Sequence, residues 1–315
     1  MVIFTQTFKM MLKLKRTLIY LIFIALGSLL AVFAMREAID GTSTNVNLLI
    51  DRYLSIFFMF TFMWVIGIPF LISMANRGAS LIQEEIEEGT LVVLVSKPIS
   101  RYRILLEKWL ASFVVSLLLG LTSMFINLTM MVFMLSLDSA IISILLSLQL
   151  SLIVYIIFMN IVMTSISLMF SLVLKKRVRT IILLVVLIMV TFAVFPLFKV
   201  PLMQMGYYDG LKLYLIDLNY QFGVVYYTII DTFTTIKFTP ETQVIISQFL
   251  GIFEVGNASP FTNGYGGIDE DLGFLHGNFG ISKYIHPAII ISFWVTVSAA
   301  NILLSTLLVK RMDIS

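Results

Sequence analysis

The sequence contains no cysteine, only two histidines and few charged residues. The lack of cysteine excludes disulfides, thiolate metal sites and cysteine nucleophiles together. Charged residues make up 12% of the chain and hydrophobic residues 59%, a balance that cannot be divided between a core and a surface exposed to water. Most of the chain therefore has lipid as its solvent.

Signatures of catalysis and of nucleic-acid binding are also missing. No Gly-Lys dipeptide occurs, so the phosphate-binding loop GxxxxGK[ST] is absent and the chain cannot be a P-loop ATPase by itself. Neither HExxH nor GxSxG is present, so no zinc protease or serine hydrolase is indicated. The net charge of +3 is small and basic residues lie at the ends of apolar runs, which argues against a nucleic-acid groove. No catalytic residue, metal site or cofactor is assigned to this chain.

Six apolar runs are long enough to cross about 30 Å of hydrocarbon at about 1.5 Å per residue. They cover residues 18–35, 53–75, 109–135, 143–174, 180–198 and 287–309. None of these runs contains Asp, Glu, Lys, Arg or His. This disfavours an ion-coupled carrier, because such carriers place ionisable groups at membrane depth. The sequence predicts an all-α integral membrane protein with six transmembrane helices, organised as a single domain over residues 1–315.

Lysine and arginine indicate how the chain is oriented, because cytoplasmic flanks carry the excess of basic residues. Four segments hold 15 of the 21 basic residues and alternate correctly through six spans. These segments are residues 1–17, 76–108, 175–179 and 310–315. We therefore expect both termini in the cytoplasm and the long segment 199–286 outside.

The N-terminal segment 1–16 has the pattern of an amphipathic helix in the headgroup layer. Its apolar side carries Phe4, Phe8, Met11 and Leu12, and its polar side carries Gln6, Lys9, Lys13 and Arg16. The alternative is a plain basic flank that enforces orientation, a reading favoured by Lys15 on the apolar side.

The external segment contains shorter elements. Residues 211–234, and a run that starts at Thr239-Pro240-Glu241 and extends to about Val255, are expected as interfacial or re-entrant helices too polar to span. Residues 256–284 are rich in glycine and carry Asp269-Glu270-Asp271, so we expect an irregular exposed loop there. In the second span, Gly67 and Pro69 predict a bend.

The segment between the second and third spans carries the most specific pattern. Ser80 and Gln83 have the spacing of a capping box, so we expect a short acidic helix that ends near Gly89. Pro98 should break the chain that follows, and Ser100 can cap the helix that enters the membrane. The alternative is a solvated charged loop.

This segment resembles the corresponding loop of the ABC-2 type transporter permeases. The residues that fit the pattern, in order and at matching spacing, are Glu85, Glu87, Gly89, Thr90, Leu91, Leu94, Pro98, Ser100, Arg101, Leu105, Leu106 and Lys108. The sequence departs from the family at Ile86 and Glu88, where basic residues are common, and at Glu107, where glycine is common. The six-span layout and the long external segment also fit the family.

The resemblance implies a permease of a prokaryotic plasma membrane that exports an unidentified substrate. In that family the loop is a coupling helix seated on a separate ATP-binding cassette subunit, which binds ATP and Mg. The coupling residues implied here are Gln83, Glu84, Glu85, Glu87, Glu88, Gly89, Thr90, Pro98 and Arg101. The resemblance further implies a second permease copy or a homologue. The alternative function is a non-transporting membrane scaffold that holds a soluble partner through the same loop.

Small and weakly polar residues line one face of the third span. They are Ser112, Ser116, Gly120, Ser123 and Asn127, and the fourth span adds Asn160 and Thr164. Such a stripe permits close helix packing, with a substrate-facing wall as the alternative. A single copy is expected to leave these stripes without enough partners, which also favours a dimer with the pathway at its interface. The exported compound is left open among hydrophobic or amphipathic compounds, peptides, lipids and export for metalloenzyme maturation.

Overall fold

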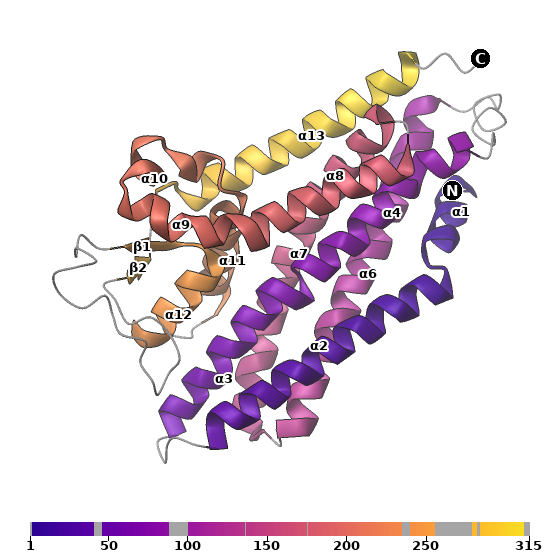
Figure 1. The fold of residues 1–315 in the computed structure, drawn as a ribbon. Coiled ribbons are helices and arrows are strands. Elements are labelled where there is room, and N and C mark those ends of the chain that lie inside the picture. The colour runs from indigo at the N-terminus through magenta and orange to yellow at the C-terminus, as the bar shows by residue number, and fades with distance from the viewer. Residues whose placement is uncertain are drawn as a thin grey trace.

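A computed structural model describes residues 2–40, 46–87, 100–135, 137–174, 176–234, 240–255, 279–281 and 284–311. Long helices lie side by side in one bundle, and both chain termini lie at the same end of it (Figure 1). This arrangement is what an even number of crossings requires. We call this end the terminal end and the other the loop end.

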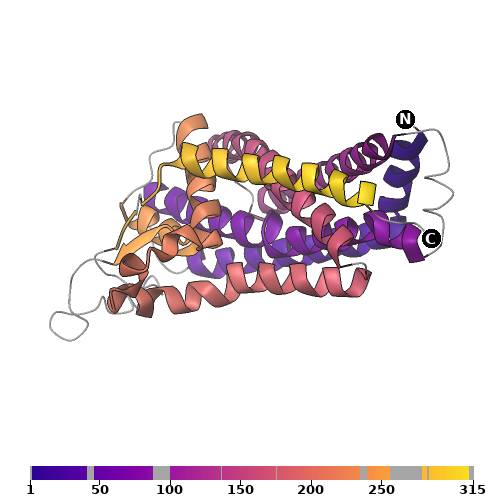
Figure 2. The ribbon, with the colours of Figure 1, turned by 90° about the horizontal axis from the view of Figure 1, so that it is seen from above.

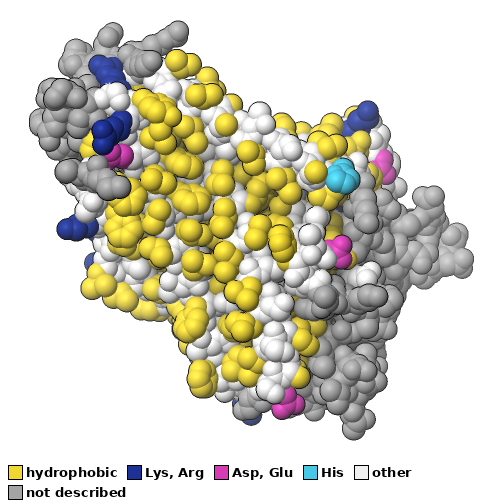
Figure 3. Space-filling model, turned by 180° about the vertical axis from the view of Figure 1, so that it is seen from behind, with side chains coloured by type: hydrophobic (Ala, Val, Ile, Leu, Met, Phe, Trp, Pro, Cys, Tyr) yellow, Lys and Arg dark blue, Asp and Glu magenta, His cyan; other side chains and the backbone are white. Residues whose placement is uncertain are grey.

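Six helical segments in the described part of the chain are long and apolar enough to cross a membrane, as predicted. They are Leu14–Arg36, Tyr53–Gln83, Arg101–Leu135, Ser139–Val173, Arg177–Gln204 and Pro287–Val309. The face of the bundle seen in Figure 3 is broadly hydrophobic, with several lysine and arginine side chains near the terminal end. Lipid can solvate that surface, and water can solvate its charged edge.

The helices that form these spans run in chain order. The first two spans are α2 (Leu14–Asp40) and the broken helix α3 (Val46–Phe60) with α4 (Ile68–Glu87), and the next two are α6 (Arg101–Leu135) and α7 (Ser139–Val173). The fifth comprises α8 (Arg177–Met189) and α9 (Phe195–Gln204), and the sixth is α13 (Pro287–Arg311). α7 is central because it packs against α4, α6, α11 and α13. Seen from above, α8 and α13 both run along the bundle and are separated from each other (Figure 2).

The predicted bend in the second span is present. A π-helical turn, η1 (Thr61–Val65), follows α3, and the helix is interrupted at Ile66–Gly67 before α4 begins. A Cβ atom on Gly67 would lie 2.3 Å from the backbone oxygens of both Phe62 and Met63, so only glycine fits here. A second π-helical turn, η2 (Val190–Val194), precedes Pro196 in the fifth span and was not predicted. The nitrogen of Pro196 has no hydrogen to donate, so a regular helical hydrogen bond is missing next to η2.

The separate acidic helix expected from Ser80 is not formed. α4 continues without a break from Ile68 to Glu87, so Ser80 and Gln83 lie inside a helix instead of at its start. The Ser80 hydroxyl donates to the carbonyl of Arg77, 2.8 Å away, which is a bond within the helix. The apolar run ends at residue 75 because polar residues follow it. The helix continues because no residue there breaks the helical backbone. Gly78 is accommodated because it packs directly on Ser167 of α7.

The structure describes the beginning of the N-terminal segment 1–17 and the start of the third span, both of which were expected on the cytoplasmic side. α1 (Val2–Met11) is a helix whose Ile3, Thr7 and Met11 are buried while Gln6 and Lys9 are exposed. The predicted N-terminal helix is present but shorter than residues 1–16: it ends at Met11, packs against α6, and leaves Arg16 in α2. α6 begins at Arg101, directly after Ser100.

The loop end is built from short elements between the fifth and sixth spans. They are α10 (Tyr207–Gly210), the 3-10 turn η3 (Leu213–Leu215), α11 (Leu218–Phe233), α12 (Pro240–Leu250), β1 (Phe253–Val255) and β2 (Phe279–Ile281). α12 begins at Pro240 as predicted but ends at Leu250, because Gly251 adopts a φ of 67° and turns the chain. The chain then forms β1, which pairs antiparallel with β2. α11 packs against α7, α12 and α13, and the predicted loop lies outside the described residues over 256–278 and 282–283.

Candidate coupling site and intramembrane cavity

The last two turns of α4 contact several other helices at the terminal end. The side-chain amide of Gln83 is fully buried and donates to the backbone oxygen of Ser171 at 2.7 Å and to the hydroxyl of Thr180 at 2.9 Å. These bonds tie α4 to the end of α7 and the start of α8. Both bonds come from the side-chain nitrogen, and together they fix the relative positions of three helices.

Two buried basic side chains attach α4 to its other neighbours. Arg77 donates to the backbone oxygen of Met11, so α4 holds the end of α1. Lys108 of α6 forms an ion pair with Glu85 and donates to the backbone oxygen of Leu81 at 2.8 Å. The Lys108 side chain is 1% exposed and that of Glu85 17%, so the pair lies at the edge of the buried region.

The start of α6 has further ties. The guanidinium of Arg101 donates to the backbone oxygen of Val309 on α13 at 2.9 Å. The backbone N–H of Phe4 donates to the Glu107 carboxylate at 3.2 Å, and Glu107 also pairs with Arg103 at 3.0 Å. The two helix ends that border residues 88–99 are therefore linked to α1, α7, α8 and α13.

The predicted coupling residues do not share one environment in the structure. Gln83 and Glu85 have internal structural roles, and Arg101 holds the last span. Glu84 and Glu87 belong to the last turn of α4. Glu88, Gly89, Thr90 and Pro98 lie outside the described residues. The roles of Arg77 and Lys108 were not predicted. Lys108 was recognised only as part of the family pattern, and Arg77 only as a basic residue between Asn76 and Gly78.

The small-residue stripe of α6 is buried inside the chain. Ser112, Ser116, Gly120, Ser123 and Asn127 all lie against other helices of the bundle. The Ser123 hydroxyl shares a 2.8 Å hydrogen bond with Tyr20 of α2, and Asn160 of α7 donates to the Phe113 carbonyl at 2.7 Å. Thr164 bonds within α7, where its hydroxyl donates to the Asn160 carbonyl. The stripes therefore pack against other helices of a single copy, whereas we expected them to require a second copy.

Replacing Gly120 by Leu is expected to destabilise the bundle. A Cβ atom alone would lie 3.0 Å from Ile156 and 3.2 Å from the Phe70 ring, so the rest of a leucine side chain has no space. Overpacking of this kind costs about 1–3 kcal/mol. The midpoint of thermal unfolding in detergent micelles should fall, and Thr122→Leu on the exposed side of the same helix is the control. An unchanged midpoint in the Gly120 variant would contradict this packing.

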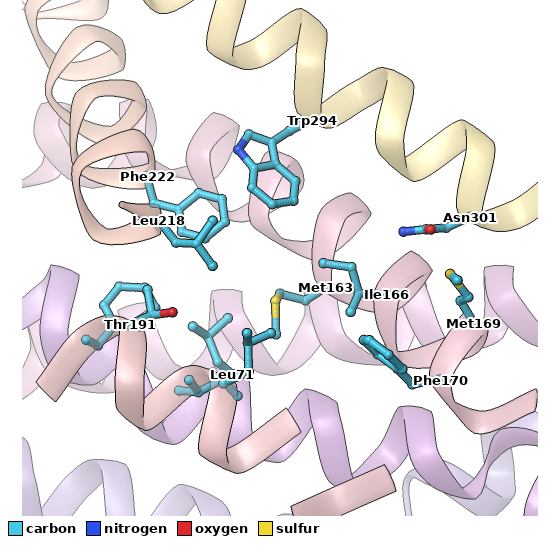
Figure 4. A pocket seen from close by; sticks show the side chains of 13 residues that line it. Leu71, Met163, Ile166, Met169, Phe170, Thr191, Leu218, Phe222, Trp294 and Asn301 are labelled. Atoms are coloured by element: carbon cyan, nitrogen blue, oxygen red, sulfur yellow. The ribbon is translucent and has the colours of Figure 1, made fainter. Parts of the chain in front are cut away.

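A cavity of about 330 Å³ lies between α4, α7, α8, η2, α11 and α13. Methionine, aromatic and aliphatic side chains form most of its wall, with Thr191 and Asn301 on opposite sides (Figure 4). Trp294 also lines it, but its indole N–H is already bonded to Gln221 at 2.8 Å. The wall carries no charged side chain. It can therefore hold an apolar group with one or two hydrogen bonds.

A second buried ion pair lies at the loop end. Lys199 of α9 and Asp217, which precedes α11, approach to 2.9 Å, and both side chains are buried. Lys199 also donates to the Gly251 carbonyl, while Asp217 accepts from the Tyr208 hydroxyl at 2.8 Å and the Tyr220 N–H at 3.0 Å. Burial and the charge of Asp217 raise the pKa of Tyr208 far above its usual value, so its hydroxyl remains a donor.

The six apolar runs contain no ionisable residue, but the candidate helical spans are longer than the runs. The apolar run ends at residue 198, but the fifth span continues to Gln204 and includes Lys199. The N-cap role of Asp217 was the available signal, because aspartate commonly precedes a helix. No group of three or more metal-binding side chains occurs among the residues whose positions are described.

Comparison with known proteins agrees with this architecture. The profile of the family described as ABC-2 family transporter protein matches residues 1–309. A search of curated proteins returned no match. The family match includes all six candidate spans and both helix ends at the candidate coupling site. The chain therefore belongs to the ABC-2 family of transporter proteins.

Proposed function

We propose that this chain is the permease subunit of an exporter driven by a separate ATP-binding cassette ATPase. The observation that supports this most directly is the continuous helix α4, which leads from the membrane to the segment 88–99. Its last turns are hydrogen-bonded or ion-paired to α1, α6, α7 and α8. A force applied at the end of α4 therefore reaches four other helices, as a coupling element requires.

The terminal end is the cytoplasmic end in this proposal. Basic residues are concentrated in segments that belong to it, and both termini lie there. The ATPase binds ATP and Mg and docks beneath this end on residues 84–100. A second permease copy or a homologue completes the transporter in the plasma membrane of a prokaryote. The dimer is proposed from the family, since the small-residue stripes are buried within one chain.

Reversing the charge of Glu87 and Glu88 to Lys tests the docking surface. Glu87 is the last residue of α4, and Glu88 follows it in the sequence. Glu85 is left unchanged because it forms the ion pair with Lys108. Reversal of acidic groups at close contacts can cost several kcal/mol of binding. We expect normal insertion and at least a tenfold loss of the copurified ATPase. The control is Asp209→Lys with Asp231→Lys, which adds the same charge on exposed residues of the loop end.

Two results would contradict the proposal in different ways. Wild-type copurification of the ATPase would show that Glu87 and Glu88 do not contact it. A copurified partner that never hydrolyses ATP when the complex is placed in nanodiscs would favour the scaffold function. Hydrolysis stimulated by a transported compound is the result expected of the exporter.

A further inference from the structure

A lateral groove of about 620 Å³ runs between α2 and α4 near the terminal end. Its apolar lining consists of Ile19, Ile22, Phe23, Leu26, Pro69 and Ile72. The four residues from α2 are each at least half exposed, so their side chains contact acyl chains when α2 spans the membrane. The helical break at Gly67 comes directly before Pro69, so the interruption of the second span lies next to this groove.

One end of the groove is basic. Arg16 and Arg77 both line it there, with Ser73 and Asn76 beside them, and none of the lining residues is acidic. The described partners of the Arg77 guanidinium are neutral oxygens, from the Met11 carbonyl and the hydroxyls of Ser73 and Thr17. Neutral dipoles stabilise a buried cation less than a counter-charge does. The Asn76 oxygen accepts from a third arginine, Arg177, at 3.3 Å, which adds positive charge near the same end.

The dimensions of the groove match one leaflet of a bilayer. From Arg16 to Leu26 the helix α2 rises about 15 Å, at about 1.5 Å per residue. This is half of the roughly 30 Å hydrocarbon core. The charged end therefore lies at headgroup level when the apolar end lies near the middle of the membrane.

We propose that this groove binds an anionic phospholipid of the leaflet at the terminal end. Its phosphate lies against Arg16 and Arg77, and an acyl chain follows the apolar side chains of α2 and α4. A lipid in this position bridges α2 to α4, whose far end borders the proposed docking segment. The binding itself does not depend on the chain being an ATP-driven exporter.

Native mass spectrometry of the full-length protein tests this proposal. The protein is released from nanodiscs of phosphatidylglycerol or of phosphatidylcholine with the same acyl chains, and retained lipids are counted. We expect retention of one phosphatidylglycerol per chain and little phosphatidylcholine. Arg16→Gln should weaken retention about fivefold, as expected for loss of one basic residue at a membrane surface. Lys15→Gln is the control, because Lys15 is exposed on the same helix turn and does not line the groove.

A second variant tests the acyl chain site without changing charge. Ile22→Trp fills the middle of the groove and should lower lipid retention, whereas Leu30→Trp, on an exposed residue of α2 beyond the groove, should not. Equal retention of the two lipids would show that the groove has no preference for an anionic headgroup. Equal loss in the Arg16 and Lys15 variants would show general attraction to a basic surface. Cross-linking between Ile22 residues of two copies, with no lipid retained, would show that a second chain covers the groove. Each of these three results overturns the proposal.

Discussion

Replacing Asp217 by Asn is expected to destabilise the loop end by about 3–5 kcal/mol, because it leaves Lys199 buried without a counter-charge. Asparagine has nearly the same shape and is also a good N-cap, so the start of α11 should be retained. The aromatic rings of Tyr208, Tyr220 and Phe253 lie 4.7–5.3 Å from the ammonium, but they cannot replace a carboxylate. The midpoint of thermal unfolding in detergent micelles measures the loss.

The double variant Lys199→Met with Asp217→Asn separates charge from packing. Methionine fills a similar volume and makes favourable contacts with aromatic rings, so most of the lost stability should return. A double variant as unstable as Asp217→Asn alone would mean that the ammonium hydrogen bond to Gly251 holds this end together. In that case the ion pair is not the cause of the instability.

The spans could be predicted because each one is a long apolar run. The hydrophobicity of a run depends only on its residues and not on how the helices pack. The bend at Gly67 was predictable for a related reason, since glycine and proline act through the local backbone. The starts of α6 and α12 follow the same logic, because Ser100 and Pro240 are local signals.

The ends of the membrane helices were not predictable from hydrophobicity. Polarity marks where lipid ends, but a helix continues until something breaks it, and nothing in Asn76-Arg77-Gly78 does so once Gly78 packs on Ser167. For the same reason Lys199 was excluded from a span that in fact includes it. The strands β1 and β2 depend on a pairing between residues far apart in sequence, which no local pattern of three residues specifies.

The candidate coupling site was predictable as a segment but not as a set of contacts. The pattern from Glu85 to Lys108 indicated the family, and the family profile confirms it. That Glu85 and Lys108 pair with each other could not be read from their spacing, because α4 and α6 meet only in the folded chain. The sequence therefore assigned Glu85 to a partner surface, whereas the structure gives it an internal role.

This internal role predicts that Glu85→Gln will destabilise the terminal end by about 2–3 kcal/mol. The Lys108 ammonium is buried, and after the change its described partner would be the neutral Leu81 carbonyl. The expected loss is smaller than at Asp217 because Glu85 remains in partial contact with water. Thermal unfolding in micelles measures stability, and ATP hydrolysis by the copurified complex measures coupling.

Glu107→Gln is a matched control for Glu85→Gln. Both glutamates are 17% exposed and both pair with a basic residue, but Arg103 is 65% exposed whereas Lys108 is 1% exposed. An exposed pair contributes less than about 1 kcal/mol, so the control should change stability little. Lys108→Met combined with Glu85→Gln should recover stability, since no buried charge is left. If that double variant is stable but no longer couples ATP hydrolysis to the spans, the ion pair joins α4 to α6 during the transport cycle. If Glu85→Gln and Glu107→Gln cost the same, burial of Lys108 does not govern this end of the molecule.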